Sequence, residues 1–149
     1  MCAACLRPCA TCVCKFVAPV AAAVDVLILQ HPLEVANAKG SARLLHLCLP
    51  GSTMLTGEVF DADVLHQALY AGNRQPLLLY PVLGDERSLG IAPPPPFPAT
   101  IEPAALRLVV LDGTWRKSRK MLHLNKGVQA IPRLPLSEVP ATHYSIRKA

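Results

Sequence analysis

Four short aliphatic runs constrain the fold of this chain more than any other feature of its sequence. They cover residues 24–29, 77–80, 106–111 and 128–131. Runs of this length, rich in Val, Ile and Leu, are typical of buried strands. Amphipathic helical patterns lie between them, and 149 residues fit one domain with a sizeable core. The alternation predicts an α/β fold in which a mostly parallel sheet is flanked by helices.

Capping residues and apolar spacing predict where two of the helices begin. Ser41 is expected to cap a helix that runs to Leu47, because its hydroxyl can accept a free amide hydrogen of the first turn. Asp61 or Asp63 is expected to open a second helix that runs to Tyr70. Both helices lie between the aliphatic runs at 24–29 and 77–80.

Residues 82–103 lose all periodicity and contain a run of prolines at 93–96 and a further proline at 98. Proline fixes the backbone and lacks a hydrogen-bond donor, so this stretch is predicted to be an extended loop. A loop of this length inside one domain is either a lid, an RNA-facing arm or a plain surface excursion.

Five cysteines lie within the first fourteen residues. Cys2, Cys5, Cys12 and Cys14 form a CxxC followed by a CxC, with Cys9 between the pairs. Four thiolates at this spacing suit tetrahedral zinc, whereas a redox pair, a disulfide remnant or reduced thiols without a role are the alternatives. We predict a structural zinc knuckle over residues 1–15, with Cys9 as an alternative to one of the four ligands, followed by one globular unit over residues 16–149.

Two features of the sequence argue against a membrane or secretory protein. The longest apolar region, residues 16–29, is interrupted by Asp25 and is shorter than the roughly 20 residues of a membrane helix. The cysteine-rich start also differs from a secretory leader. We therefore expect a cytoplasmic protein with no membrane contact.

The junction around Asp112 is the most informative place to look for chemistry. The run at 106–111 ends in Asp112-Gly113-Thr114-Trp115, and a basic amphipathic stretch follows at 116–122. In open α/β sheets, ligands collect outside the carboxyl ends of strands, where the first amides of a helix are free. Asp112 is the candidate general base, with a helix N-cap as the alternative. Trp115, the single tryptophan, is either a stacking platform or a core anchor.

Five further motifs occur together with the cysteine knuckle and in a fixed order. They are Gln30-His31-Pro32-Leu33-Glu34, Lys39-Gly40-Ser41-Ala42-Arg43-Leu44, Leu79-Tyr80-Pro81, Asp112-Gly113-Thr114-Trp115 and Tyr144-Ser145-Ile146-Arg147-Lys148. Together they resemble the DTW-domain family of tRNA-uridine aminocarboxypropyltransferases. The resemblance implies a SPOUT-like fold, S-adenosylmethionine as donor and tRNA as partner. It also implies transfer of the 3-amino-3-carboxypropyl group to N3 of a uridine, giving acp3U and methylthioadenosine.

The resemblance also suggests a role for each matching residue, beginning with Asp112 as general base. The expected donor-binding residues are Tyr80, Pro81, Leu111, Gly113, Thr114, Trp115, Ser41 and Arg43. The expected tRNA-binding residues are His31, Glu34, Arg116, Lys117, Arg119, Lys120, Tyr144, Arg147 and Lys148. His31 and Glu34 could instead make structural hydrogen bonds, and Ser41 could simply cap its helix. The basic stretch at 116–122 could be a solvated helix face.

The chain ends at Ala149, directly after Arg147 and Lys148, where members of the family continue into a Leu-Ser-Thr-x-Glu-Ala segment. SPOUT-like proteins form a C-terminal knot, a rare exception to unknotted topology, so we expect the knot and the donor pocket to be incomplete here. Two other functions remain open. They are a SPOUT-type RNA methyltransferase and a noncatalytic, zinc-stabilised RNA-binding protein.

Overall fold

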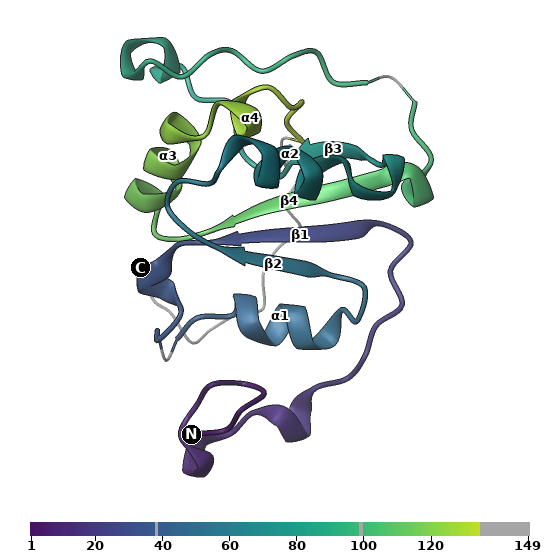
Figure 1. Cartoon of the computed structure of the whole chain (residues 1–149), viewed down its shortest axis with the longest axis vertical. Helices are drawn as coiled ribbons and strands as arrows, with labels where there is room; N and C mark the ends of the chain where they lie inside the picture. The colour runs from purple at the N-terminus through teal and green to yellow at the C-terminus, as the bar shows by residue number, and fades with distance from the viewer. Residues whose placement is uncertain (38, 99, 135–149) are drawn as a thin grey trace, which may run out of the picture.

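Four parallel strands form the sheet at the centre of the protein (Figure 1). The computed structural model describes residues 1–37, 39–98 and 100–134. The strands are β1 (Asp25–Gln30), β2 (Thr53–Thr56), β3 (Gln75–Leu78) and β4 (Leu106–Asp112), in the order β2-β1-β4-β3. All three pairings are parallel, which confirms the predicted α/β class.

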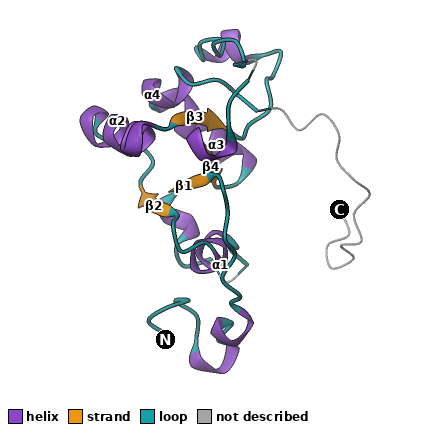
Figure 2. Cartoon of the chain, turned by 90° about the vertical axis from the view of Figure 1, so that its right-hand side faces the viewer, coloured by secondary structure: helices purple, strands orange, loops and turns teal. Residues whose placement is uncertain are grey.

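Helices cover both faces of the sheet. Helix α1 (Ala42–Cys48) lies on one face, and α2 (Ala62–Tyr70), α3 (Trp115–Leu124) and α4 (Lys126–Gln129) lie on the other (Figures 1 and 2). Side chains of a strand alternate between faces, so β1 contributes to two cores. The smaller core contains Val26, Ile28 and Ala42. The larger core contains Leu27, Leu29, Leu65, Leu69, Leu78, Tyr80, Ile91, Val109, Met121, Leu122, Val128 and Ile131.

The two predicted helix starts are confirmed in position, but only one cap forms as expected. Asp61 precedes α2, and its carboxylate accepts the N–H groups of Asp63 and Val64 at 3.0 and 3.1 Å. Ser41 precedes α1, yet its hydroxyl makes no capping hydrogen bond. The predicted role of the Ser41 hydroxyl as a cap is therefore wrong.

The prediction of a strand at residues 128–131 is also wrong. Val128 lies in α4, and Ile131 follows that helix, with 1% of each residue exposed. A run of four residues cannot reveal its period, and a buried helical turn satisfies the same hydrophobicity. Strand β2, in contrast, was not predicted, because its two exposed threonines enclose only two half-buried apolar residues.

The long segment between β3 and β4 has the predicted irregular character. Its described residues contain no α-helix or strand, only 3-10 turns at Glu86–Leu89 and Pro103–Ala105. Glu86 is 4% exposed and pairs with the buried guanidinium of Arg133, and Ile91 enters the larger core. The segment is thus anchored to the body of the protein.

Two expectations concern residues beyond the described part of the chain, and a third concerns membrane-spanning helices. Tyr144, Arg147 and Lys148 lie outside the described residues, as does the C-terminal part that would form a knot. None of the described helices has both the length and the apolar character needed to cross a membrane.

Candidate active site and metal centre

The carboxyl ends of β1 and β4 meet at the centre of the sheet. Gln30 and Asp112 are register partners, and the N–H of His31 donates to the Asp112 carbonyl at 2.9 Å. The chain leaves β1 towards β2 at one edge of the sheet, but it reaches β4 from β3 at the other edge. Neighbouring strands with opposite connections define a topological switch point, where open α/β sheets bind ligands.

Asp112 is held at this switch point by a buried amide. Gln30 is 5% exposed, and its Nε2 donates to Oδ2 of Asp112 at 2.9 Å. Among the described residues, Oδ1 of Asp112 has no hydrogen-bond partner. Thr114 is the N-cap of α3, and its hydroxyl accepts the Lys117 N–H at 3.4 Å. The carboxylate is thus not the helix cap, and one of its oxygens is available to a ligand.

Gly113 lets the chain turn tightly from β4 into α3. A Cβ atom on Gly113 would lie 3.1 Å from Cβ of Lys117 and 3.5 Å from the backbone nitrogen of Ser118. A larger residue would push the strand away from the first turn of the helix. The glycine therefore keeps Asp112 close to the free amides of α3.

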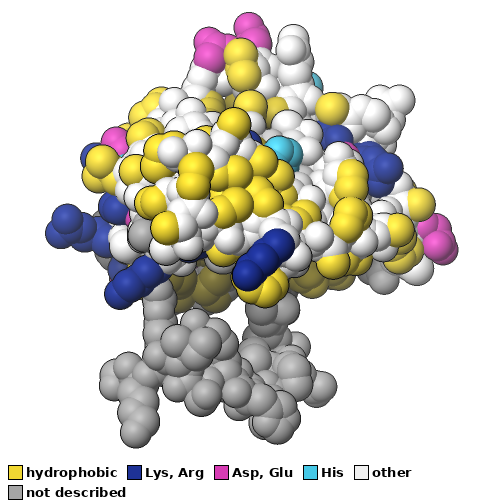
Figure 3. Space-filling model, turned by 90° about the horizontal axis from the view of Figure 1, so that it is seen from below, with side chains coloured by type: hydrophobic (Ala, Val, Ile, Leu, Met, Phe, Trp, Pro, Cys, Tyr) yellow, Lys and Arg dark blue, Asp and Glu magenta, His cyan; other side chains and the backbone are white. Residues whose placement is uncertain are grey.

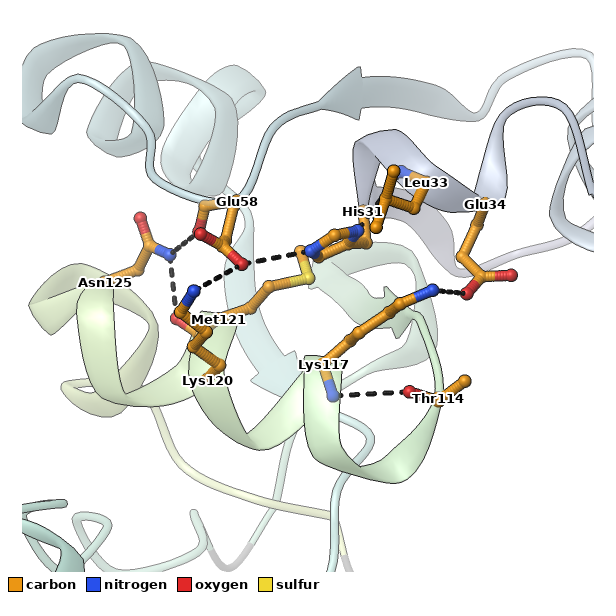
Figure 4. Close-up of polar contacts among 9 residues, drawn as sticks. All are labelled: His31, Leu33, Glu34, Glu58, Thr114, Lys117, Lys120, Met121 and Asn125. Carbon is orange, nitrogen blue, oxygen red and sulfur yellow. Dashed lines mark hydrogen bonds and ion pairs between the residues drawn. The ribbon is translucent and has the colours of Figure 1, made fainter.

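His31 connects the end of β1 to the segment after β2 (Figure 4). Its Nδ1 accepts the Leu33 N–H at 3.2 Å, so the ring proton is on Nε2, which donates to Glu58 at 3.1 Å. Lys120 of α3 contacts the same Glu58 oxygen at 3.0 Å. The His31 hydrogen bond and then Lys120 lower the pKa of Glu58 below its ordinary value.

Glu34 is a buried carboxylate with two partners. Lys117 donates to one of its oxygens and Asn37 to the other, both at 2.7 Å (Figure 4 shows the lysine contact). The Lys117 hydrogen bond and then that of Asn37 lower the pKa of Glu34. The structure thus gives His31 and Glu34 structural hydrogen bonds, and their role in binding substrate stays a prediction.

The basic stretch of α3 is largely paired with carboxylates. Besides Lys117 and Lys120, Arg119 contacts Asp85 at 2.7 Å. Arg116 is exposed, and no carboxylate of the described residues lies within ion-pair distance of it. The stretch therefore offers less free positive charge to a polyanion than its sequence suggests.

Tyr80 and Trp115 bring the ends of β3 and β4 together. Their rings stack with centroids 5.3 Å apart and an interplanar angle of 5°. Burial raises the pKa of Tyr80, whose hydroxyl lies 3.5 Å from that of Ser118. Trp115 is 51% exposed, so it is not the core anchor considered above. Leu111 packs on the larger core, and the Pro81 carbonyl accepts a hydrogen bond from Arg133 at 3.0 Å.

Ser41 and Arg43 lie at the start of α1 and not beside Trp115. Nε of Arg43 donates to the Ala4 carbonyl at 2.7 Å, and Arg7 donates back to the Gly40 carbonyl at 3.2 Å. These two hydrogen bonds dock the N-terminal cysteine segment on the body of the protein. A cavity of about 250 Å³ lies between them, lined by Arg43, Gln30 and Glu34 among others. The segment thus forms one wall of a cavity that reaches the end of β1.

Figure 3 shows the face of the molecule on which the N-terminal cysteine segment lies. This face is hydrophobic at its centre and has Lys and Arg side chains towards its edges. The large apolar side chains that the first twenty residues expose are Met1, Leu6, Phe16 and Val20.

The four predicted zinc ligands come together. The sulfur atoms of Cys2, Cys5, Cys12 and Cys14 all lie within 4.8 Å of one another, and two pairs are 3.5 and 3.7 Å apart. A tetrahedral zinc site with bonds of about 2.3 Å has sulfur atoms about 3.8 Å apart. Cys9 is exposed and outside this cluster. The donor set therefore fits a zinc ion, and Cys9 does not replace a ligand.

The thiols of the cluster shift one another's pKa values. The backbone N–H of Val13 lowers the pKa of Cys5 to about 6, whereas the hydrogen bond with Cys2 raises the pKa of Cys14 to about 12. Four adjacent thiols cannot all ionise without a cation among them. A bound metal supplies that charge.

Two residues of the site were missed by sequence reasoning. Gln30 carried a signal, because a polar amide as the last residue of a buried strand needs a partner there. Glu58 carried none, because it follows β2, which was itself not predicted.

The chain is a parallel α/β protein with polar side chains at its switch point and four cysteines placed so that they could bind a metal ion. Comparison with protein families then shows that the chain belongs to the DTW domain family, whose model matches residues 1–149, the whole chain. This is the family of tRNA aminocarboxypropyltransferases, so the resemblance seen in the motifs is confirmed. No curated protein sequence and no solved structure matches the chain.

Proposed function

We propose that the protein transfers the 3-amino-3-carboxypropyl group of S-adenosylmethionine to N3 of a tRNA uridine, giving acp3U and methylthioadenosine. Membership of the DTW family supports a role in tRNA modification. The observation that carries the specific reaction is Asp112. One of its oxygens is fixed by Gln30, and the other is available at the switch point of the sheet.

The chemistry requires a base at this place. N3 of uridine carries a proton and is a poor nucleophile until that proton leaves. Asp112 accepts the proton, N3 forms a bond to the γ-carbon of the methionine moiety of the donor, and the bond from that carbon to the sulfonium sulfur breaks. The electron pair of the broken bond stays on sulfur, which leaves as the neutral thioether. Alignment of N3 with this carbon selects it over the methyl group.

Backbone groups are the proposed contacts for the donor. The segments Tyr80-Pro81 and 111–115 lie at the ends of β3 and β4, and the first amides of α3 are free to bind oxygen atoms. The backbone of Trp115 lies in the second of these segments, and Tyr80 covers one face of its ring. Arg43, with Ser41, is the proposed contact for the donor carboxylate across the cavity that it shares with Gln30. We also propose that the domain has a SPOUT-like fold.

The tRNA is proposed to bind along α3 and the nearby ends of β1 and β2. Arg116 is the exposed cation of this surface, and Lys120 keeps an exposed fraction of 58% beside Glu58. Contacts of these cations with phosphates give affinity that falls with added salt, whereas selection of uridine belongs to the pocket. Tyr144, Arg147 and Lys148, which lie outside the described residues, are further proposed contacts for the tRNA. We further propose that the four clustered cysteines bind a structural zinc ion. Thiols stay reduced in the cytoplasm, which is the proposed location of the protein.

The test is mass spectrometry of nucleosides from unmodified tRNA incubated with the protein and S-adenosylmethionine. The wild-type protein is expected to give aminocarboxypropyl-uridine. Asp112→Asn is expected to lose at least about a hundredfold in rate while it keeps its fold and its donor affinity. Asp63→Asn, an exposed Asp-to-Asn change on α2, is the matched control.

Each other result decides against part of the proposal. Full activity in Asp112→Asn excludes it as the base. A methyl-uridine product identifies a methyltransferase. Binding of tRNA with neither binding nor consumption of the donor identifies a noncatalytic RNA-binding protein.

A further inference from the structure

A groove with an apolar floor lies between α3 and the segment that follows the 3-10 turn at Glu86–Leu89. Its volume is about 410 Å³, and its apolar lining consists of Leu89, Ile91 and Trp115. Ile91 is 3% exposed and anchors the floor, while Leu89 and Trp115 are 40% and 51% exposed. Concave apolar surfaces of this size accommodate small organic groups.

Trp115 is fixed in orientation although half of it is exposed. Tyr80 stacks in parallel on its ring and is itself 5% exposed in the larger core. The indole therefore loses little conformational entropy when a flat ligand stacks on it. A rigid, exposed aromatic ring is the feature that proteins use to bind an unstacked nucleobase.

The remaining lining of the groove is basic. Arg116, Arg119 and Lys120 line it from one face of α3, because residues three and four apart share a helix face. Asp85 holds the guanidinium of Arg119, and Glu58 holds the ammonium of Lys120. No Asp or Glu is among the lining residues of the described chain. The groove thus combines an apolar floor with Arg116, which has no carboxylate of the described residues within ion-pair distance, and with two cations whose charge is partly balanced from outside the lining. This lining complements a base joined to phosphates.

A glycine allows the segment on one side of the groove to approach α3 closely. Gly90 has a positive φ of 69°, and a Cβ atom there would lie 3.3 Å from Cε1 of His123, which also lines the groove. Only glycine adopts this backbone conformation without strain and leaves the histidine in place. The segment from Leu89 to Ile91 can therefore lie directly against α3.

We propose that this groove is a subsite for an unpaired nucleobase of RNA, next to the uridine that is modified. The proposal rests on the proposed function and deepens it, because it states that the RNA is single-stranded around the target. Trp115 follows Asp112 by three residues, so a base in the groove neighbours the reacting one. Bases inside a duplex are stacked on each other and cannot reach the indole, whereas bases of a loop can.

The direct test uses the fluorescence of Trp115, the single tryptophan of the chain. The probes are a single-stranded oligouridylate of about ten nucleotides and an RNA duplex of the same length. We expect saturable quenching by the single strand, and an affinity for the duplex about tenfold weaker or less. Equal quenching by both, or no quenching by either, overturns the subsite.

A charge placed in the groove gives the second test. Leu89→Glu is expected to weaken single-strand binding about tenfold or more, because it repels phosphate and removes apolar floor. The matched control is Val64→Glu on α2, which makes the same kind of change at a side chain that is 50% exposed. Equal affinities of the two variants, with folding verified by circular dichroism, overturn the proposal. Tighter groove-dependent binding of a phosphopeptide or of phosphatidylserine vesicles than of the oligonucleotide also overturns it.

The two proposals can fail separately. Quenching requires neither donor nor transfer, so it persists if the reaction is not the one proposed. If transfer occurs, Leu89→Glu is expected to raise KM for tRNA about tenfold with kcat changed less than about twofold, since the groove binds a base that does not react. Transfer with unchanged KM in this variant contradicts the subsite and leaves the proposed function intact.

Discussion

The Glu34–Lys117 pair gives the sharpest quantitative test of the structure. The distance between Lys117 Nζ and Glu34 Oε1 is 2.7 Å, and the side chains are 27% and 7% exposed. A hydrogen bond to a charged group contributes about 1.5–3 kcal/mol. Because the lysine is partly exposed, we expect a coupling energy of about 1–2 kcal/mol between the two side chains. Lys117→Met is expected to cost about 2–3 kcal/mol, more than Glu34→Gln, since it leaves a buried carboxylate with Asn37 alone.

The pair also makes stability depend on pH in a defined direction. The pKa of Glu34 is lowered from its ordinary value of 4.5. Its contribution is therefore complete above that value and is lost as the pH falls through the folded pKa. The coupling energy is therefore expected to be smaller at about pH 3 than at neutral pH.

The assay is urea unfolding of the wild type, Glu34→Gln, Lys117→Met and the double variant at both pH values. The exposed pair Arg119–Asp85 provides the matched control, and its coupling is expected to stay below about 0.5 kcal/mol because Asp85 is 57% exposed. A Glu34–Lys117 coupling below about 0.3 kcal/mol, or one that does not decline in acid, refutes the reasoning.

Two further predictions concern the N-terminal segment. The wild-type protein is expected to hold one zinc per chain by elemental analysis, and Cys5→Ser to lose it together with several degrees of melting temperature, whereas Cys9→Ser keeps both because Cys9 is outside the cluster; equal losses in the two variants contradict the ligand set. Arg43→Ala is expected to weaken binding of S-adenosylmethionine, measured by calorimetry, more than Arg7→Ala does. Both variants remove one hydrogen bond that docks the segment, so equal effects mean that Arg43 serves docking and not the donor.

The sequence predicts the parts of the fold that have a long or well-bounded signal. The continuous run before Gln30 and the one before Asp112 could be assigned because central parallel strands are apolar on both faces. Asp61 marked its helix because a carboxylate there has free amides to accept. The edge strand with Met54 and Leu55, and the helical turn with Val128, could not be assigned, because four residues carry no readable period.

The sequence predicts which residues of the candidate site carry chemistry, but not which side chains they contact. The junction that contains Asp112 and Trp115 is visible in the sequence because a strand and a helix meet there without an intervening loop. The partner of Asp112 is not visible, since Gln30 lies 82 residues away and their contact depends on the strand order. The lysines of α3 were expected to contact RNA, yet the carboxylates that hold Lys117 and Lys120 come from other elements.

The strand order also fixes when the site can form during synthesis. Of the described strands, β3 pairs only with β4, and β4 is the last of the four to leave the ribosome. A nascent chain that ends before β4 can pair β1 with β2, but it leaves β3 without a neighbour and its apolar faces open to chaperones or aggregation. Pairing across 82 residues closes a large loop of chain, which makes this step slow. The sheet, and with it the contact between Gln30 and Asp112, therefore cannot be complete before β4 inserts between β1 and β3.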